Sequence, residues 1–443
     1  MSDTIAAVAT SLSSAAGINI IRISGDNAKV IADKIFKCAK ITDGVMEPNR
    51  MYLGRIDGEN FSEKAFCVYC KSPFSYTGED VIEIHCHGGR GITQAVLRLV
   101  RENGARPAEA GEFTRRAFLN GKLSLAEAEG VIDMINASTE SQIRNAYKLM
   151  SGELTKGIKE SERLLTETAA MLEAKLDYPE ELEEETRPKA KENIILSYNE
   201  TVKLLKGASH RKVVNEGIDI AIVGIPNAGK SSLLNALLGQ DRAIVSDEAG
   251  TTRDVVKESM ETDGIKLNFL DTAGIREGDG INAVEKIGIE RSKRAIESAD
   301  VILNVIDLSV PETSGEREIN ALTDGKKVIY VANKSDKEIY PRNGIKICAK
   351  SGEGINEILT EILKFADRDS IYSEGVVTNE RHVFALEECE RQLEEALSFY
   401  DILPSECVLE NVRGALNALG KITGNNVSEG IIDEVFSRFC VGK

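Results

Sequence analysis

The sequence lacks the features that mark secreted and membrane-embedded chains. Its first residues, Met-Ser-Asp-Thr, show no basic segment followed by an apolar one, so no signal peptide is expected. No apolar run approaches the roughly 20 residues that are needed to span a membrane. The 8 cysteines follow no regular spacing, which favours a reducing compartment over a disulfide framework. We therefore expect a cytoplasmic chain without membrane contacts.

Basic charge is also scarce. The chain carries 55 basic and 72 acidic side chains, and its net charge of −17 argues against broad, nonspecific binding of nucleic acid. The imbalance is uneven, because residues 1–120 hold 15 basic and 14 acidic side chains, whereas residues 216–372 hold 20 and 28. Any contact with nucleic acid should therefore be confined to one surface or supplied by a partner protein.

Four short segments follow one another in the order that guanine-nucleotide hydrolases use. They read Gly224-Ile225-Pro226-Asn227-Ala228-Gly229-Lys230-Ser231, Gly250-Thr251-Thr252-Arg253-Asp254, Asp271-Thr272-Ala273-Gly274 and Asn333-Lys334-Ser335-Asp336. A single glycine-rich loop with a lysine recurs by chance and in many ATPases, but four such segments in this order do not. The sequence therefore predicts that the chain binds and hydrolyses GTP.

The first segment has the composition of a phosphate-binding loop. The apolar, β-branched run 218–223 predicts a strand before the loop, and residues 232–237 open a helix after it. Gly224 and Gly229 let backbone N–H groups turn toward phosphate oxygens at the N-terminus of that helix. Lys230 then reaches the β- and γ-phosphates, and the Ser231 hydroxyl ligates Mg²⁺.

The later segments complete the expected site. Thr252 lies on a loop that can close on Mg²⁺ when a γ-phosphate is present, and Asp271 follows a predicted strand and holds the metal through water. Asp336 can accept two hydrogen bonds from guanine. One expected group is missing, because Ile275 stands where many regulatory GTPases carry the Gln that orients the attacking water. Glu285 is the nearest carboxylate in a helical context, although such a residue, taken alone, is usually a solvated helix position.

The chain divides into segments of different character. Residues 1–120 mix short β-branched runs (17–24, 64–69 and 81–85) with helical patterns, which predicts an α+β domain. From Ser124, whose spacing to Glu127 predicts a capping box, long helices are expected. Their apolar pattern is interrupted by Tyr178-Pro179-Glu180 and by the acidic run 183–185. Two apolar stripes at helical spacing predict core-facing helices. They are Leu154, Ile158, Leu165, Leu172 and Leu176, and Val383, Leu386, Leu393, Leu397 and Tyr400. A helical domain over 121–215 and 373–443, split by an inserted α/β domain over 216–372, is the simplest account.

Beyond the GTPase segments, several motifs resemble one family along the whole chain. They are Ile20-Ile21-Arg22-Ile23-Ser24-Gly25, Tyr76-Thr77-Gly78-Glu79-Asp80, His87-Gly88-Gly89, the stretch from Ala110 to Asn120, and the C-terminal Phe439-Cys440-Val441-Gly442-Lys443. With them the sequence resembles the MnmE (TrmE) family of bacterial tRNA-modification GTPases. The resemblance implies an N-terminal tetrahydrofolate-binding and dimerisation domain, a discontinuous helical domain and a Ras-like domain. It also implies a flavoprotein partner, MnmG, joined in a heterotetramer, and modification of the tRNA wobble uridine at C5 with an aminomethyl or carboxymethylaminomethyl group.

The resemblance also implies roles for individual residues. A potassium ion would be held beside the phosphates by Asn227, Ser246, Glu248 and Thr251 once two GTPase domains pair, and Glu285 would orient the attacking water, with Lys230 and Thr252 as the other catalytic groups. The nucleotide contacts would be Asn227, Ala228, Gly229, Lys230, Ser231, Ser232, Ser246, Asp247, Glu248, Ala249, Gly250, Thr251, Thr252, Asp271, Thr272, Ala273, Gly274, Asn333, Lys334, Ser335 and Asp336. A 5-formyl- or 5,10-methylene-tetrahydrofolate would be held by Arg22, Glu83, Lys122 and Lys443, with Cys440 beside it.

Two departures from the family pattern stand out. The family usually carries a Pro/Gly-rich loop before the first Arg-bearing strand, whereas residues 11–17 here are rich in Ser and Ala, which could alter the folate pocket or the dimer contact. The last guanine-contacting segment reads Cys348-Ala349-Lys350, with Cys in place of the usual Ser. Since the Ala349 N–H would contact the base, little functional change is expected.

Two alternatives remain open at the level of sequence. Cys67, Cys70, His85 and His87 could be assembled into a Cys₂His₂ zinc site, but Cys67 and Cys70 are three apart in a predicted strand and should point to opposite faces. The chain could also be a GTPase that acts as an assembly or ribosome-associated switch without modification chemistry. A pure switch needs neither the folate-type N-terminal domain nor the Phe439–Lys443 tail, so these two features distinguish the functions.

Overall fold

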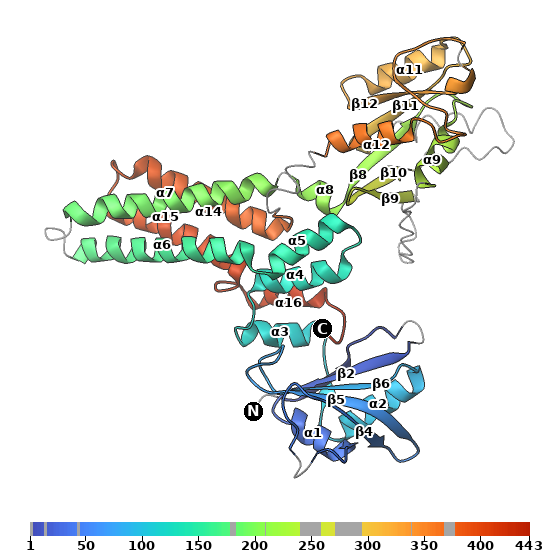
Figure 1. Ribbon diagram of the computed structural model, residues 1–443. Helices are drawn as coiled ribbons and strands as arrows, with labels where there is room; N and C mark the ends of the chain where they lie inside the picture. The colour runs from blue at the N-terminus through green and yellow to red at the C-terminus, as the bar shows by residue number, and fades with distance from the viewer. Residues whose placement is uncertain are drawn as a thin grey trace. The chain divides into compact units, whose positions relative to one another are not determined.

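A computed structural model gives the fold. It describes residues 3–12, 16–41, 45–177, 183–208, 210–239, 258–270, 295–337, 339–366 and 377–443 (Figure 1). The chain forms two compact units. The first contains Met1–Ile135, Leu149–Arg163 and Leu416–Lys443, and the second contains Asn136–Lys148 and Leu164–Ala415. Among the described residues, no helix is both long and apolar enough to cross a membrane.

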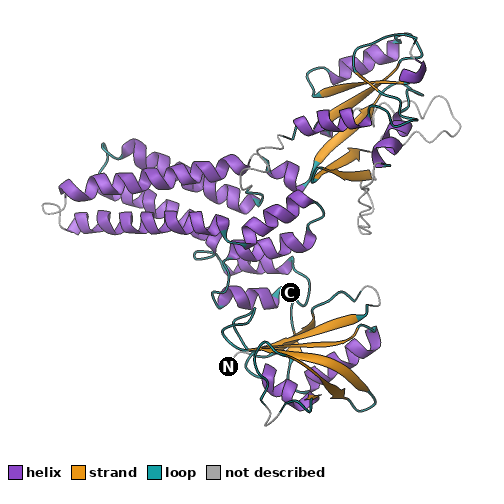
Figure 2. Cartoon of the chain, in the orientation of Figure 1, coloured by secondary structure: helices purple, strands orange, loops and turns teal. Residues whose placement is uncertain are grey.

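The first unit is built on a seven-stranded sheet in the order β3-β4-β5-β6-β2-β1-β7 (Figure 2). Its strands are β1 Ile5–Val8, β2 Ile18–Ser24, β3 Phe36–Lys37, β4 Met51–Asp57, β5 Ser62–Cys70, β6 Val81–His87 and β7 Arg106–Pro107, and its helices are α1 Ala28–Ile35 and α2 Arg90–Glu102. Alternate residues of β2 and β6, such as Ile21 and Ile84, are buried with α1 and α2, because the side chains of a strand alternate between its two faces. The other face carries Arg22, Glu83 and His85, which are only partly buried.

The same unit contains the C-terminal residues. Helices α3 Glu112–Leu119, α4 Leu125–Asn136 and α16 Glu429–Ser437 belong to it. The predicted capping box is confirmed, since the Glu127 N–H donates to Ser124 Oγ at 3.2 Å and the Ser124 N–H donates to Glu127 Oε2 at 2.7 Å. Phe436 and Phe439 pack with Leu125 in a small apolar cluster. This packing brings the last residues of the chain beside α3 (Figure 1).

Helices make up one part of the second unit. They include α5 Glu140–Met150, α6 Glu153–Asp177, α7 Glu183–Ala208, α8 Arg211–Asn215, α14 Glu380–Phe399 and α15 Ser405–Thr423; α5, α6 and α15 continue into the first unit. Both predicted stripes face the interior, since Leu165, Leu386 and Leu393 are fully buried. The predicted interruption falls between α6, which ends at Asp177, and α7, which begins at Glu183. Tyr178, Pro179 and Glu180 lie outside the described residues, and the acidic run 183–185 starts α7. Acidic residues are favourable in the first turn of a helix, where the backbone N–H groups are unpaired.

The α/β part of the second unit has a six-stranded sheet in the order β13-β12-β11-β8-β10-β9, parallel except at the edge strand β9. Its strands are β8 Ile218–Val223, β9 Glu258–Thr262, β10 Ile265–Leu270, β11 Val301–Asp307, β12 Val328–Asn333 and β13 Ile345–Lys346; its helices are α9 Lys230–Leu238, α11 Ser314–Thr323 and α12 Ile355–Lys364, with the 3₁₀ turn η1 Ser335–Lys337. The central strands are apolar because both faces of the sheet are covered. Together with the first unit, this sheet and the long helices confirm the predicted fold class.

Candidate functional site

The loop between β8 and α9 holds a conformation that a phosphate group can enter. Gly224, Asn227 and Gly229 have φ angles of 151°, 62° and 99°, so three positions in six residues are left-handed. Gly229 is also the N-cap of α9, and a Cβ there would collide with the Asn333 side chain. The loop therefore needs glycine at this position, and it presents the N-terminus of α9 at the carboxyl end of β8, where parallel sheets bind their ligands.

Lys230 folds back over the loop. Its Nζ donates to the carbonyl oxygens of Gly224 and Ile225, both at 2.9 Å. Burial lowers the pKa of Lys230, since no acidic side chain among the described residues compensates the desolvation of its ammonium group. A polyphosphate bound in the loop would supply that compensating charge. Ser231 and Ser232, which were predicted to contact Mg²⁺ and nucleotide, lie in the first turn of α9.

The predicted guanine-binding residues meet the loop at the same edge of the sheet. Asn333, at the end of β12, donates from Nδ2 to Ala228 O at 2.8 Å, and its Oδ1 accepts from the Ala349 N–H at 3.1 Å. The Ala349 N–H thus fixes Asn333 in this structure, and its expected contact with the base stays a prediction. Asp336 Oδ1 accepts a hydrogen bond from Cys348 Sγ at 3.5 Å. Asn333 thus joins three segments that are far apart in sequence.

A buried ion pair supports this arrangement and was not predicted from the sequence. Lys334, with φ of 65°, places its Nζ 2.5 Å from Asp307 Oδ2 at the end of β11. Burial opposes ionisation of Asp307, but hydrogen bonds from Lys334 and Ser309 outweigh it, so its pKa lies below the ordinary value. The position of Asp307 directly after an apolar strand is the sequence signal that could have found it.

The remaining nucleotide and cation residues lie outside the described part of the chain. These are Ser246, Asp247, Glu248, Ala249, Gly250, Thr251, Thr252, Asp271, Thr272, Ala273, Gly274, Ile275 and Glu285. Of the four predicted potassium ligands the structure describes Asn227 alone, and of the two predicted magnesium ligands it describes Ser231 alone.

A second polar site lies on the open face of the N-terminal sheet. Arg22 on β2 stands directly opposite Glu83 on β6, and its Nε and Nη2 approach Glu83 Oε1 at 3.0 and 2.9 Å. The guanidinium lies 5.6 Å from the Tyr76 ring centroid and 5.7 Å from that of Phe113, in the range of a cation–π contact. His85 approaches the other oxygen of Glu83, with its Nε2 3.6 Å from Oε2.

The C-terminal tail reaches the element that carries Phe113. The Phe113 N–H donates to Lys443 O at 3.1 Å, and Val441 forms a backbone bridge with Ala110. Phe113 is therefore in contact with both Arg22, through its ring, and the backbone of Lys443, the last residue of the chain. Cys440 is exposed beside this bridge. The fourth predicted residue, Lys122, donates instead to Pro73 O at 2.9 Å.

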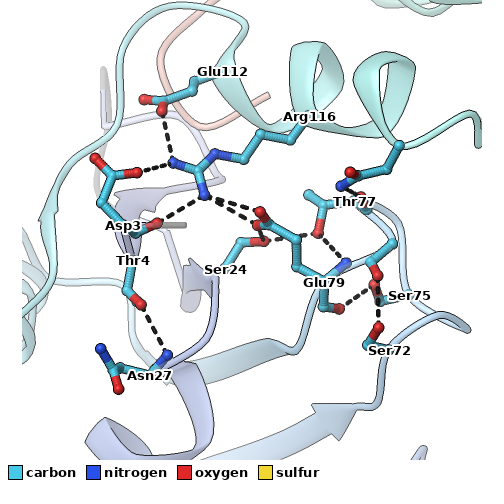
Figure 3. A network of polar contacts seen from close by, with 12 residues as sticks. Asp3, Thr4, Ser24, Asn27, Ser72, Ser75, Thr77, Glu79, Glu112 and Arg116 are labelled. Carbon is cyan, nitrogen blue, oxygen red and sulfur yellow. Dashed lines mark hydrogen bonds and ion pairs between the residues drawn. The ribbon is translucent and has the colours of Figure 1, made fainter. Parts of the chain in front are cut away.

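A charged network beneath this site was missed by sequence reasoning (Figure 3). Arg116 on α3 donates to Asp3 Oδ1 at 2.7 Å, to Glu112 Oε1 at 3.0 Å and to both oxygens of Glu79 at 3.1 Å. Burial raises the pKa of Glu112, but hydrogen bonds from Arg106 and Arg116 reverse this, so the net shift is downward. The network ties α3 to the loop between β5 and β6. Glu79 and Arg116 occur within the family motifs, and these motifs were the sequence signal that could have pointed to the network.

The zinc alternative is not supported by the geometry. Cys67 is paired in register with Ile84 and is fully buried on the helix-covered face, whereas His85 lies on the open face. His87 Nδ1 is 2.7 Å from Glu63 Oε1. Burial raises the pKa of Cys67 to about 12, so its thiol stays protonated. The four side chains therefore do not converge on one ion.

Comparison with known proteins extends over the whole chain. Residues 4–122 match the family described as GTP-binding protein TrmE N-terminus, and residues 125–440 match the MnmE helical domain family. The chain is 41% identical over 458 residues to the tRNA modification GTPase MnmE of Clostridioides difficile (strain 630), covering 100% of this chain and 99% of that protein. It is 40% identical over 464 residues to the protein of the same name from Geobacillus thermodenitrificans, with the same coverage.

Solved structures resemble part of the chain. Era, in its crystal structure with MgGDPNP and 16S ribosomal RNA, is 31% identical with a TM-score of 0.27, and the match covers 39% of this chain and 65% of Era. The full-length relatives and the two family matches carry the assignment and confirm the resemblance that the motifs indicated. The chain belongs to the MnmE (TrmE) family of tRNA modification GTPases.

Proposed function

We propose that this chain is a potassium-dependent GTPase that acts with an MnmG-type flavoprotein on tRNA. In this proposal the pair adds an aminomethyl or carboxymethylaminomethyl group to C5 of the wobble uridine, with a carbon supplied by a tetrahydrofolate. The chain would act as a homodimer in the cytoplasm. We also propose the domain boundaries 1–120, 121–215, 216–372 and 373–443. Family membership supports the GTPase and its role in tRNA modification, and the two polar sites support the finer chemistry.

The loop at 224–231 supports nucleotide binding. Its left-handed residues and the N-terminus of α9 offer backbone N–H groups, and the half-buried Lys230 ammonium has no acidic partner among the described residues. A triphosphate satisfies both, which is the fit required of GTP. Mg²⁺, when bound, would neutralise charge between the β- and γ-phosphates, and Ser231 and Thr252 would hold it. Asn227 would contribute to a potassium site with Ser246, Glu248 and Thr251, and Glu285 would orient water in place of the missing Gln.

The observation that carries the folate half is the Arg22–Glu83 pair beside the C-terminal tail. Glu83 presents one oxygen to Arg22 at 2.9 Å, and its second oxygen remains at 3.6 Å from the nearest imidazole nitrogen. A carboxylate in this state can accept N–H groups from the donor edge of a pterin, and Lys122 or Lys443 can pair with the folate carboxylates. The bound folate would supply the one-carbon unit, while Glu83 and Arg22 orient it.

The decisive experiment measures the modified nucleoside. In a strain lacking this gene, mass spectrometry of tRNA nucleosides should show loss of the wobble-uridine modification. The wild-type gene should restore it, and Glu83→Ala should not, although that variant should still hydrolyse GTP. If the modification persists without the gene, the chain is better explained as an assembly or ribosome-associated switch.

The cation requirement is tested separately. GTP hydrolysis should be much faster in KCl than in NaCl, and Asn227→Ala should remove most of that difference. Glu285→Ala should retain nucleotide affinity but lose at least about tenfold in turnover, the scale expected for a positioned catalytic group. Equal rates in the two salts would overturn the potassium site, and turnover within about twofold of wild type would leave Glu285 as a surface residue.

A further inference from the structure

The carboxylate of Glu83 has neighbours on both sides, but only one of them is hydrogen-bonded. Arg22 approaches Oε1 with two nitrogens, at 2.9 and 3.0 Å. On the opposite side, His85 lies two residues further along β6, on the same face of the strand, with Nε2 3.6 Å from Oε2. That distance is too long for a hydrogen bond. Arg22 therefore fixes one oxygen of Glu83, and among the described residues no hydrogen bond fixes the other oxygen.

The imidazole is incomplete in the same way. His85 Nε2 is buried and has no hydrogen-bond partner among the residues that the structure describes. Buried polar atoms without a partner are rare, because leaving one unpaired costs free energy. Glu83 Oε2 lies 3.6 Å from this nitrogen, and a small movement of either side chain would bring the two atoms within hydrogen-bonding distance.

A second His–Glu pair, between His87 on β6 and Glu63 on β5, is hydrogen-bonded. His87 lies on the end of β6 with its Nδ1 2.7 Å from Glu63 Oε1, and its backbone N–H donates to the same oxygen at 2.8 Å. His87 is 72% exposed, whereas the His85 side chain is 19% exposed. His87 and Glu63 are thus hydrogen-bonded, whereas His85 and Glu83, beside the proposed folate site, lie just beyond hydrogen-bonding distance.

We propose that His85 is a positioning residue for Glu83, and this inference rests on the proposed folate function. With the proton on Nε2, the imidazole donates to Glu83 Oε2 when a reduced folate binds. Arg22 and His85 then hold both oxygens in one plane, which two parallel N–H groups of a pterin edge require. His85 acts through Glu83 and makes no contact with the ligand.

The test is a double-mutant cycle on binding of 5-formyltetrahydrofolate, measured by isothermal titration calorimetry on the full chain. His85→Ala should weaken binding about tenfold, the scale of one lost hydrogen bond to a charged group. His85→Gln, which keeps an N–H donor, should recover most of the affinity. In a Glu83→Ala background, adding His85→Ala should change the remaining affinity less than about twofold, because the residue it positions is gone.

Two controls separate this role from a structural one. His87→Ala should leave folate affinity unchanged, and GTP hydrolysis should be equal in all variants. Full affinity in His85→Ala, or a His85 effect that persists without Glu83, would overturn the proposal while leaving the folate site intact. A wild-type chain that binds no 5-formyltetrahydrofolate would overturn the folate function itself, and the inference with it.

Discussion

The two polar sites of this chain are built in opposite ways. The phosphate-binding loop is continuous, since Gly224 to Ser231 connect one strand to the next helix and hold their shape through backbone angles and short-range contacts. The proposed folate site, around Arg22 and Glu83, is assembled from β2, β6, α3 and the last residue of the chain. One site depends on local conformation, and the other depends on packing between distant segments.

This difference predicts different weaknesses. A loop whose shape is set by glycine conformation should fail when a side chain is added, because the left-handed region penalises a Cβ. A site assembled by packing should fail when a distant support is removed, although its own residues are untouched. The five predictions that follow test this contrast.

The largest effect should come from the far end of the chain. Deleting Phe439 to Lys443 removes a buried aromatic ring and the partner of the Phe113 N–H, so folate binding and tRNA modification should be abolished. GTP hydrolysis should stay close to wild type, because the phosphate loop uses none of these residues. Val441→Ser is the matched control, since this exposed side chain can change while its backbone bridge remains. A truncated chain that still modifies tRNA fully would contradict the packing account.

Removing the charge of Arg116, which pairs with Asp3, Glu79 and Glu112, should destabilise the first unit. Arg116→Leu leaves Glu112 buried without its full set of donors, and breaking a buried pair of this kind costs about 3 kcal/mol. The measurement is the free energy of unfolding by urea. Arg163→Leu, which breaks an exposed pair with Glu160, should stay within about 0.5 kcal/mol of wild type.

The acid dependence of the same network has a defined sign. The pKa values of Asp3 and Glu112 are lowered in the folded chain, by hydrogen bonds from Arg106 and Arg116 that outweigh burial. Their contribution is therefore complete above the unfolded values of about 3.9 and 4.3, and it is lost as the pH falls through the folded values. The difference in the free energy of unfolding between wild type and Arg116→Leu should therefore become smaller below about pH 4. A difference that stays constant down to pH 2 would contradict this.

The phosphate loop should respond to a single methyl group. In Gly229→Ala the new Cβ meets the Asn333 side chain. The alanine also has to adopt the φ of 99° that glycine has here, which costs about 1–3 kcal/mol of backbone strain. GDP affinity should fall roughly 10- to 100-fold, measured with a fluorescent nucleotide, while 5-formyltetrahydrofolate binding is retained. Gly315→Ala, whose Cβ meets Ile225 Cγ2 at 3.4 Å and Thr313 Oγ1 at 3.9 Å, both ordinary van der Waals contacts, should be neutral. Equal loss in both variants would mean that the effect is not specific to the loop.

The smallest effect is expected at the guanine end. Cys348 Sγ donates to Asp336 Oδ1 at 3.5 Å, and a thiol is a weak donor. Cys348→Ser should strengthen this bond and slow GDP release by about two- to fivefold, with Cys407→Ser as an exposed control. Faster GDP release in Cys348→Ser would show that the thiol is the better fit to this position.

Local features of the fold could be predicted because neighbouring residues decide them. The structure has three such features at the residues where the sequence pattern predicted them: the strand 218–223, the capping box at Ser124 and the apolar stripes. The acidic run at 183–185 interrupts the apolar pattern and yet starts α7, because glutamate is a good helix former and is favoured in a first helical turn. The Arg116 network could not be predicted from spacing, since Asp3, Glu79 and Glu112 approach Arg116 only after the sheet and α3 have packed.

The sequence by itself determined the phosphate loop, because glycine positions and a strand–helix junction fix backbone angles within a few residues. It also determined the family, through motifs that recur from end to end. The tertiary structure alone decided which residues surround Glu83. Strand register sets Arg22 opposite Glu83, alternation along β6 places His85 on the same face, and burial of Phe436 and Phe439 brings Lys443 to Phe113. These contacts join positions separated by up to 330 residues between Phe113 and Lys443, and only packing of the whole unit makes them neighbours.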